Sequence, residues 1–356
     1  MAEAPRLSSE PVSEPPEPSD RYARQARFWG VGSAGQARLR AARAAVVGCG
    51  ALGAAVIDHL ARGGVGHLVA VDRDVVELSN LQRQVLYDEA DAAAGAPKAV
   101  AAARAIARVN AEVEVRPVIA DLTAANVEAI LAGAQVVIDG TDNFETRFLV
   151  NDACVKAGVP WIYGGAIGST GMVMAVRPGE TPCLRCLYPE GVAGAALATC
   201  ETAGVLAPTV AVVGAVQAAE ALKVLVGDPG RRQPGLLTFD VWTSEWTLAE
   251  GFERRPDCPC CVGRRFEHLE ARGASRSATL CGRNAVQVSP ARPMQLDLDA
   301  LARRLAAAGR VVGTDYMVRL VVGPHELTVF ADGRAIVKGT ADAAQARSVV
   351  ARYLGA

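Results

Sequence analysis

Two short cysteine pairs constrain the fold of this chain of 356 residues most strongly. Cys183 and Cys186 have C-x-x-C spacing, and Cys258 and Cys261 repeat it far along the chain. Two thiolates at this spacing reach one metal ion from a tight turn, and two such pairs supply the four ligands of a closed tetrahedral zinc site. We therefore expect structural Zn²⁺ that joins the two segments. Cys260 lies inside the second pair and is not expected to bind the metal. The alternative is that it replaces one of the paired cysteines as a ligand.

A glycine-rich loop marks the place where we expect the chemistry. Gly48-Cys49-Gly50-Ala51-Leu52-Gly53 follows an apolar strand pattern and precedes an alanine-rich helical pattern. In this context the backbone amides at the helix start can bind phosphate. Asp72 ends the next expected strand, where a carboxylate accepts hydrogen bonds from ribose hydroxyls. The pattern therefore predicts a nucleotide site formed by Gly48, Gly50, Gly53 and Asp72. The alternative interpretation is a tight strand–helix turn in which glycines are needed only for packing.

Strand and helix patterns alternate through the first half of the chain. Apolar runs at 44–47, 67–71, 113–119, 134–139 and 159–163 are separated by helical patterns. This alternation predicts an α/β fold with a Rossmann-like, doubly wound, mostly parallel sheet. Strand-like segments after residue 164, at 235–241 and at 243–248 predict a β extension beside the zinc-stapled loop.

The chain is expected to contain a tail and two domains. Residues 1–20 are rich in Pro, Glu and Ser and predict a disordered N-terminal tail. The main domain is expected at 21–265. A polar stretch near 263–275 precedes a small C-terminal α/β domain at 276–356. There we expect strands at 278–288, 315–322 and 325–330, a hairpin turn at Asp332-Gly333, and helices at 296–308 and 341–354.

Composition excludes several classes of partner. The net charge of -1 and the lack of a basic block argue against nucleic acid as the main partner. The apolar stretch 202–219 is interrupted by Pro208 and followed by polar residues, so we expect a buried or interface helix and no membrane span. Nine cysteines without a secretory signal predict a cytoplasmic protein whose thiols are free or bind metal.

Three charged residues indicate which nucleotide chemistry to expect. Arg83 and Lys98 follow the acid-bearing strand, and Asp142 follows the fourth strand, at the sheet edge where ligands bind. Arginine and lysine suit a triphosphate and its departing pyrophosphate, and an aspartate suits Mg²⁺. The alternatives are solvated charges for the two cations and a helix N-cap for Asp142.

Together these motifs resemble the ThiF/MoeB/HesA group, bacterial relatives of the ubiquitin-activating enzymes. The resemblance covers about residues 21–262 and includes both cysteine pairs. The other matching motifs are Arg21-Tyr-Ala-Arg-Gln25, Gly48-x-Gly-x-Leu-Gly53, Asp72-Arg-Asp74, Ser79-Asn-Leu-Gln-Arg-Gln84, Pro97-Lys98, Thr141-Asp-Asn143 and Thr199-Cys200 ahead of Ala203-Gly204-Val205.

The resemblance implies ATP-dependent activation of a small ubiquitin-like sulfur-carrier protein. In such enzymes the carboxylate of the carrier's C-terminal Gly-Gly attacks the α-phosphate of ATP, pyrophosphate leaves, and an acyl-adenylate remains. By resemblance Asp72 binds ribose, Arg83 and Lys98 bind phosphates, and Asp142 holds Mg²⁺.

The resemblance also implies roles for residues that the patterns alone do not interpret. The enzyme is expected to be a homodimer in which Arg24 reaches the phosphates of the other subunit's ATP. Asn80, Gln84 and Asn143 are expected to line the nucleotide site, and the four paired cysteines to hold zinc. Cys200 matches a thiol that bonds covalently with the carrier's activated terminus in some relatives; a small, partly buried residue is the alternative.

Several functions remain in competition. A ThiS-like carrier of thiamine thiazole synthesis is favoured over a MoaD-like carrier of molybdopterin synthesis by the C-terminal extension and the context of Cys200. A sulfurtransferase is a candidate further partner. A dinucleotide-dependent oxidoreductase would leave Arg83, Lys98 and Asp142 unused. A catalytically silent binding partner of another family member would not need the intact set of phosphate and Mg²⁺ residues.

Overall fold

The chain is described by a computed structural model that covers residues 21–189, 203–228, 233–251, 253–270, 277–280, 284–290 and 294–354. The contacts divide the chain into two compact units, Met1–Ala271 and Arg272–Ala356. Each unit has its own sheet and its own apolar core.

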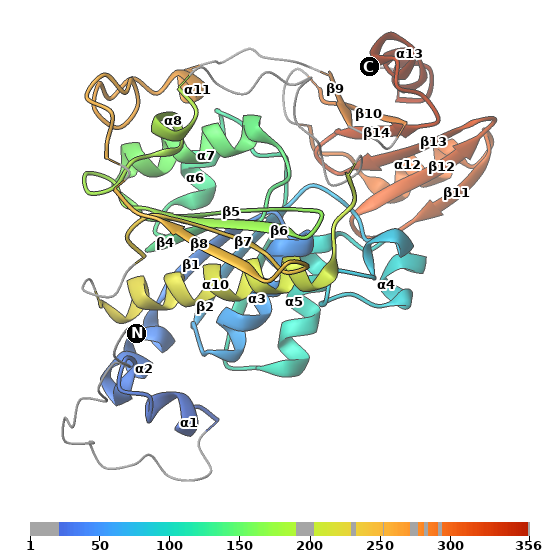
Figure 1. Ribbon diagram of the computed structural model, residues 1–356. Coiled ribbons are helices and arrows are strands. Elements are labelled where there is room, and N and C mark those ends of the chain that lie inside the picture. Colours follow the sequence, from blue (N-terminus) through green and yellow to red (C-terminus); the bar gives the residue numbers. More distant parts are fainter. Residues whose placement is uncertain are drawn as a thin grey trace. The chain divides into compact units, whose positions relative to one another are not determined.

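The first unit is built on an eight-stranded sheet with the order β3-β2-β1-β4-β5-β6-β7-β8 (Figure 1). Strands β1 to β5 pair in parallel, and β5 to β8 pair as antiparallel neighbours. The predicted doubly wound sheet and its β extension are therefore confirmed. The strands are β1 (Arg43–Val47), β2 (His67–Asp72), β3 (Glu114–Ile119), β4 (Val136–Asp139), β5 (Trp161–Ile167), β6 (Thr170–Val176), β7 (Leu236–Asp240) and β8 (Glu245–Ala249).

Helices cover both faces of this sheet. The residues of β1 alternate between two cores: Ala44 and Val46 pack in one, and Ala45 and Val47 in the other. The first core contains residues of α3 (Ala51–Arg62), α5 (Lys98–Val109) and α10 (Ala207–Val226), and the second contains residues of α6 (Val127–Leu131) and α7 (Phe144–Ala157). Figure 1 shows these two groups on opposite sides of the sheet.

The apolar helix α10 is part of the first core. By length and composition it is the one helix among the described residues that could cross a membrane. However, Gln217 on this helix is fully buried and donates to the carbonyl oxygens of Asp139 and Ile162 in the sheet. A Cβ atom at Gly214 would lie 2.7 Å from the Cβ of Ala55 on α3. The expected buried helix is confirmed.

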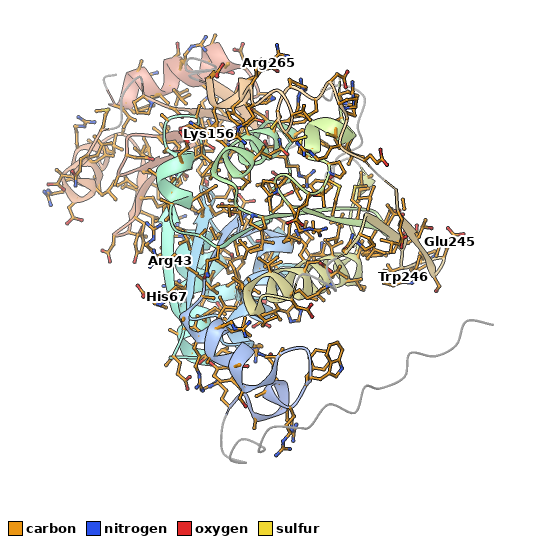
Figure 2. All side chains as sticks on the ribbon, turned by 90° about the vertical axis from the view of Figure 1, so that its left-hand side faces the viewer. Arg43, His67, Lys156, Glu245, Trp246 and Arg265 are labelled. Carbon is orange, nitrogen blue, oxygen red and sulfur yellow. The ribbon has the colours of Figure 1, made fainter. Side chains whose placement is uncertain are left out.

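The extension ends in an exposed edge strand. Trp246 on β8 stacks on Phe239 of β7 with ring centroids 4.7 Å apart and is still half exposed. Figure 2 shows Glu245 and Trp246 at the opposite end of the sheet from Arg43 and His67, which begin β1 and β2.

The second unit is a six-stranded antiparallel sheet with the order β11-β12-β13-β14-β10-β9 and two helices, α12 (Leu298–Leu305) and α13 (Ala343–Leu354). The expected single strand at 278–288 is wrong, because β9 (Ser277–Leu280) and β10 (Ala285–Val288) pair antiparallel with Leu280 opposite Ala285. The pattern also missed β11 (Arg310–Gly313). The Asp332-Gly333 turn joins β13 (His325–Phe330) to β14 (Ala335–Lys338), and β12 spans Met317–Val322.

Several short helices were not predicted because they are polar or only a few residues long. They are α1 (Ala23–Ala26), α2 (Gly32–Ala41), η1 (Leu78–Asn80), α4 (Glu89–Ala94), α8 (Leu184–Leu187) and α11 (Glu267–Glu270).

Candidate nucleotide site and cysteine cluster

The glycine loop connects β1 to α3 at the carboxyl edge of the parallel strands. Gly48 has φ 88°, and a Cβ atom there would lie 2.5 Å from the carbonyl oxygen of Gly140. A Cβ atom at Gly53 would lie 1.8 Å from the carbonyl oxygen of Gly48. At Gly50 the nearest atom, the carbonyl oxygen of Gly140, is 3.9 Å away. Packing therefore requires glycine at 48 and 53, whereas Gly50 leaves the backbone accessible to a ligand.

Asp72 attaches this loop to the end of β2. Its Oδ2 accepts a hydrogen bond from the backbone N–H of Cys49 at 2.7 Å, and its Oδ1 accepts one from the N–H of Asp74 at 2.7 Å. Burial raises the pKa of the Asp72 carboxyl, and the nearby positive charge of Lys98 opposes this shift. Tyr87 supports the same loop, because its hydroxyl donates to the carbonyl oxygen of Cys49 at 2.6 Å.

The two predicted phosphate-binding cations differ in their surroundings. Lys98 begins α5, is buried, and places Nζ 3.5 Å from Oδ2 of Asp74, so the alternative of a solvated lysine is wrong. Arg83 is half-buried, and its Nη1 donates to the carbonyl oxygen of Ser79 at 3.1 Å. A buried lysine beside carboxylates is held in one place, which suits electrostatic stabilisation of a bound phosphate.

Asn80 and Gln84 are both buried in the turn that carries Arg83. The Oδ1 of Asn80 accepts from the N–H of Glu77 at 3.0 Å, and its carbonyl oxygen accepts from the N–H groups of Arg83 and Gln84. Asn80 therefore shapes this turn. The Oε1 of Gln84 is buried without a hydrogen-bond partner among the described residues. Such an atom can accept a hydrogen bond from a bound ligand.

Asp142 and Asn143 follow β4 at the same edge of the sheet. The side chain of Asn143 caps α7, because its Oδ1 accepts from the N–H of Thr146 at 2.8 Å. The alternative that Asp142 is the N-cap is therefore wrong. Asp142 is exposed, and its carboxylate forms no ion pair with another described residue. Its negative charge acts on the nearby guanidinium groups of Arg73 and Arg147.

Arg147 is a buried residue of this region that the sequence patterns did not indicate. Its Nε lies 3.0 Å from Oδ2 of Asp139, and its Nη2 donates to the carbonyl oxygens of Thr141 and Gly164 at 2.8 and 2.9 Å. Burial raises the pKa of the Asp139 carboxyl, and Arg147 opposes this shift. Arg147 therefore joins the end of β4, the residue before Asp142 and the middle of β5.

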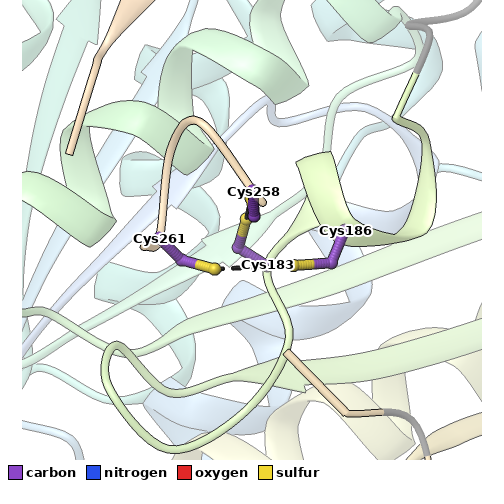
Figure 3. Close-up of side chains that lie close together, drawn as sticks. All are labelled: Cys183, Cys186, Cys258 and Cys261. Atoms are coloured by element: carbon purple, nitrogen blue, oxygen red, sulfur yellow. Dashed lines mark hydrogen bonds between the residues drawn. The ribbon is translucent and has the colours of Figure 1, made fainter. Parts of the chain in front are cut away.

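The four paired cysteines form one cluster (Figure 3). All four Sγ atoms lie within 4.8 Å of one another, with 3.7 Å between Cys183 and Cys258 and 3.4 Å between Cys186 and Cys261. Four thiolates around one ion at about 2.3 Å fit such spacings, so these residues can hold a metal. Cys260 is outside the cluster; its Sγ accepts from Nδ2 of Asn151 at 3.3 Å.

One predicted residue, Arg24, is not brought to the glycine loop of the same chain. Arg24 is exposed on α1, and its neighbour Gln25 donates to the carbonyl oxygen of Gly63 just beyond the C-terminal end of α3. The glycine loop is at the other end of α3, which at 1.5 Å per residue is roughly 18 Å away. Cys200 lies outside the described residues.

Comparisons with known proteins place the chain beside adenylyltransferases. The ThiF family matches residues 22–260. The sulfur carrier protein ThiS adenylyltransferase of Bacillus subtilis is 41% identical over 94% of this chain and 99% of its own length. The SAMP-activating enzyme E1 of Haloferax volcanii is 42% identical over 70% of this chain and 92% of its own length.

Solved structures agree on the fold. Crystals of E. coli MccB give a TM-score of 0.61 at 24% identity, over 72% of this chain and 76% of that protein. The family match and the two curated relatives confirm the expected enzyme class, and they give no support to the oxidoreductase alternative.

Proposed function

Because the chain belongs to the ThiF family, we propose that it adenylates the C-terminal Gly-Gly carboxylate of a ubiquitin-like sulfur-carrier protein, with ATP as the donor. The observation that carries the proposal is one sheet edge that holds the glycine loop, Asp72, the buried Lys98 and the exposed Asp142. Hydride transfer requires neither a fixed cation nor a free carboxylate at this edge.

The proposed reaction is a displacement at phosphorus. A carboxylate oxygen of the carrier forms a bond to the α-phosphorus of ATP, and the bond to the bridging oxygen of pyrophosphate breaks with its electron pair. The attacking carboxylate is already ionised, so no general base is needed. Lys98 and Arg83 are proposed to stabilise the charge on the phosphates, and Asp72 to bind the ribose.

The residues at the end of β4 fit a divalent cation. Asp142 offers an exposed carboxylate without an ion pair among the described residues, and oxygen ligands are those that Mg²⁺ prefers. When bound with ATP, Mg²⁺ neutralises phosphate charge. Asn143 is engaged in capping α7, so we propose that its side chain acts by fixing the loop rather than by touching the nucleotide.

The C-terminal unit favours a ThiS-like carrier. The Bacillus subtilis relative aligns over 94% of the chain, so the match continues past residue 260 into Arg272–Ala356. The Haloferax volcanii relative aligns over 70% of the chain and nearly all of its own length. The relative named for ThiS therefore shares the extension, and the other relative matches only a part of the chain that is about the size of the first unit.

We further propose a homodimer in cytoplasmic solution. Arg24 and the glycine loop lie at opposite ends of α3, so Arg24 can serve a nucleotide only in another copy of the chain. The exposed aromatic rings of Phe28 and Trp29 next to α1 give this region an apolar contact surface.

The proposed metal in the cysteine cluster is Zn²⁺, since four thiolates without an open position are typical of structural zinc. Cys183→Ala should abolish stoichiometric zinc and lower the melting temperature. Normal zinc content in that variant would refute the assignment.

Cys200→Ala should leave adenylation intact, because adenylation needs no thiol; its effect would appear only in later sulfur transfer.

Pyrophosphate exchange tests the proposed function. Labelled pyrophosphate should enter ATP only when the enzyme is incubated with a carrier that ends in Gly-Gly, and faster with a ThiS-like than with a MoaD-like carrier. The matched control is the same carrier without its last glycine. Absence of exchange with every Gly-Gly carrier would contradict the proposal.

A further inference from the structure

Helix α7 is the element that connects the cysteine cluster to the sheet edge. It begins at Phe144, directly after Asp142 and its cap Asn143, and ends at Ala157. Every residue from Arg147 to Val155 is buried, so the middle of the helix is enclosed on all sides. A helix held in this way has no freedom to shift unless its neighbours also move.

The fully buried Asn151 on α7 contacts both cysteine-bearing segments. Its Oδ1 accepts from the N–H of Leu184, which lies between the first two cysteines, at 2.8 Å. Its Nδ2 donates to Sγ of Cys260, which lies between the second two, at 3.3 Å. The next residue, Asp152, accepts from the N–H of His268 at 3.0 Å through Oδ2. The two segments that carry the paired cysteines therefore both hydrogen-bond to the middle of α7 through Asn151.

One turn before Asn151, Arg147 makes the corresponding contacts at the sheet edge. It donates to the carbonyl oxygen of Thr141, the residue before Asp142, and to that of Gly164 on β5. The loop at Asp142 is therefore held from both sides, by Arg147 before it and by the Asn143 cap after it. The side chain of Asp142 itself forms no ion pair with the described residues, so the backbone sets the point from which its carboxylate projects, and Arg73 and Arg147 act on its charge.

We propose that Asn151 is a positioning residue through which the cysteine cluster sets the place of the Asp142 carboxylate. The two ends of this connection, Phe144 and Asn151, are roughly 10 Å apart along α7 at 1.5 Å per residue. The cluster then does more than join two segments, because its geometry reaches the nucleotide edge through one rigid helix. This inference rests on the proposed role of Asp142 in holding the cation of Mg·ATP.

The test compares two buried asparagines. Asn110 is also fully buried, and its Nδ2 donates to the hydroxyl of Tyr22 and the carbonyl oxygen of Ala61, both at 2.7 Å, away from α7. Asn151→Ala and Asn110→Ala should therefore have comparable costs in thermal stability. Only a positioning role of Asn151 predicts that the two variants differ in Mg²⁺-dependent nucleotide binding.

The readout is equilibrium binding of a non-hydrolysable ATP analogue, with and without Mg²⁺, together with zinc content. Mg²⁺ should increase the affinity for the analogue in the unaltered enzyme. We expect Asn151→Ala to reduce this increase by about 10-fold, which is in the range of a residue that couples two sites. We expect Asn110→Ala to leave this gain unchanged. In an Asp142→Asn background, where the gain is already lost, adding Asn151→Ala should change nothing more.

An unchanged Mg²⁺-dependent gain in Asn151→Ala would overturn the inference, whether or not zinc is retained. If Asn151→Ala does not fold, Cys260→Ala removes one partner of Asn151 and should shift the gain in the same direction by less; no shift there would equally overturn it. No carrier is present in these assays. Failure of the proposed function would appear instead as missing pyrophosphate exchange by the unaltered enzyme.

Discussion

The two halves of the nucleotide edge are built differently. At the ends of β1 and β2, the expected ligand-binding groups also hold the structure: Asp72 bonds to the glycine loop, and Lys98 lies beside Asp74. At the end of β4, Asp142 is exposed, and its neighbours Asn143 and Arg147 hold its loop. In the first half stability and binding reside in the same side chains, and in the second they are separated. Substitutions of the charged side chains should therefore separate stability from activity only at β4.

The largest expected effect is on stability at β4. Arg147→Met should lower the free energy of unfolding by about 3–5 kcal/mol, because it leaves the buried Asp139 carboxylate without its partner. Urea denaturation measures this change. The double variant Asp139→Asn/Arg147→Met should recover part of the loss, since no uncompensated charge remains. A loss in the double variant equal to that of Arg147→Met would contradict this explanation.

The next effect separates activity from stability most clearly. Asp142→Asn should slow pyrophosphate exchange by roughly 10²–10³-fold, as for the loss of one electrostatic stabiliser. Its free energy of unfolding should change by less than about 0.5 kcal/mol, because the residue is exposed and forms no ion pair with the described residues. If Asp142→Asn were active but destabilised, the separation of stability and activity at β4 would be contradicted.

The glycine loop allows the same separation within the other half. Gly50→Ala should fold, since its Cβ would meet nothing closer than 3.9 Å, but it should raise the KM for ATP several-fold because the methyl group occupies the side open to a ligand. Gly53→Ala should destabilise the protein, since its Cβ would lie 1.8 Å from the carbonyl oxygen of Gly48. Melting temperatures and KM values for both variants check this pair.

The smallest effect concerns the support of the loop. Tyr87→Phe should lower the free energy of unfolding by about 1 kcal/mol through loss of the hydrogen bond to the carbonyl oxygen of Cys49. Tyr163→Phe is the matched control, because its hydroxyl donates to the weak acceptor Sδ of Met172 at 3.4 Å. Urea denaturation of the two variants should show the larger loss at Tyr87; the reverse order would be inconsistent with this role.

Local patterns predicted those parts of the molecule that local chemistry decides. The strand–glycine–helix pattern around Gly48 and the alternation of strands and helices were sufficient for the parallel sheet. The C-x-x-C spacing identified the two thiol pairs, although nothing in the spacing shows that they meet in one cluster.

Residues that act over long sequence distances were not predictable in this way. Arg147 has the pattern of an ordinary helical arginine, and its role depends on the carbonyl oxygen of Gly164, which only the folded sheet brings near. Asn143 and Asp142 are equally good N-caps by residue type, so the backbone geometry decides between them. The expected single strand at 278–288 overlooked Gly282 and Asn284, residue types that favour turns and that lie between the paired β9 and β10.

Intact mass spectrometry of the carrier tests the central claim most directly. After incubation of the enzyme with Mg·ATP and a Gly-Gly carrier, rapid acid quenching should show the carrier with one added adenylyl group at its C-terminus, and Asp142→Asn should yield almost none. A carrier that stays unmodified with the unaltered enzyme, or an adduct that does not depend on the terminal carboxylate, would contradict the account.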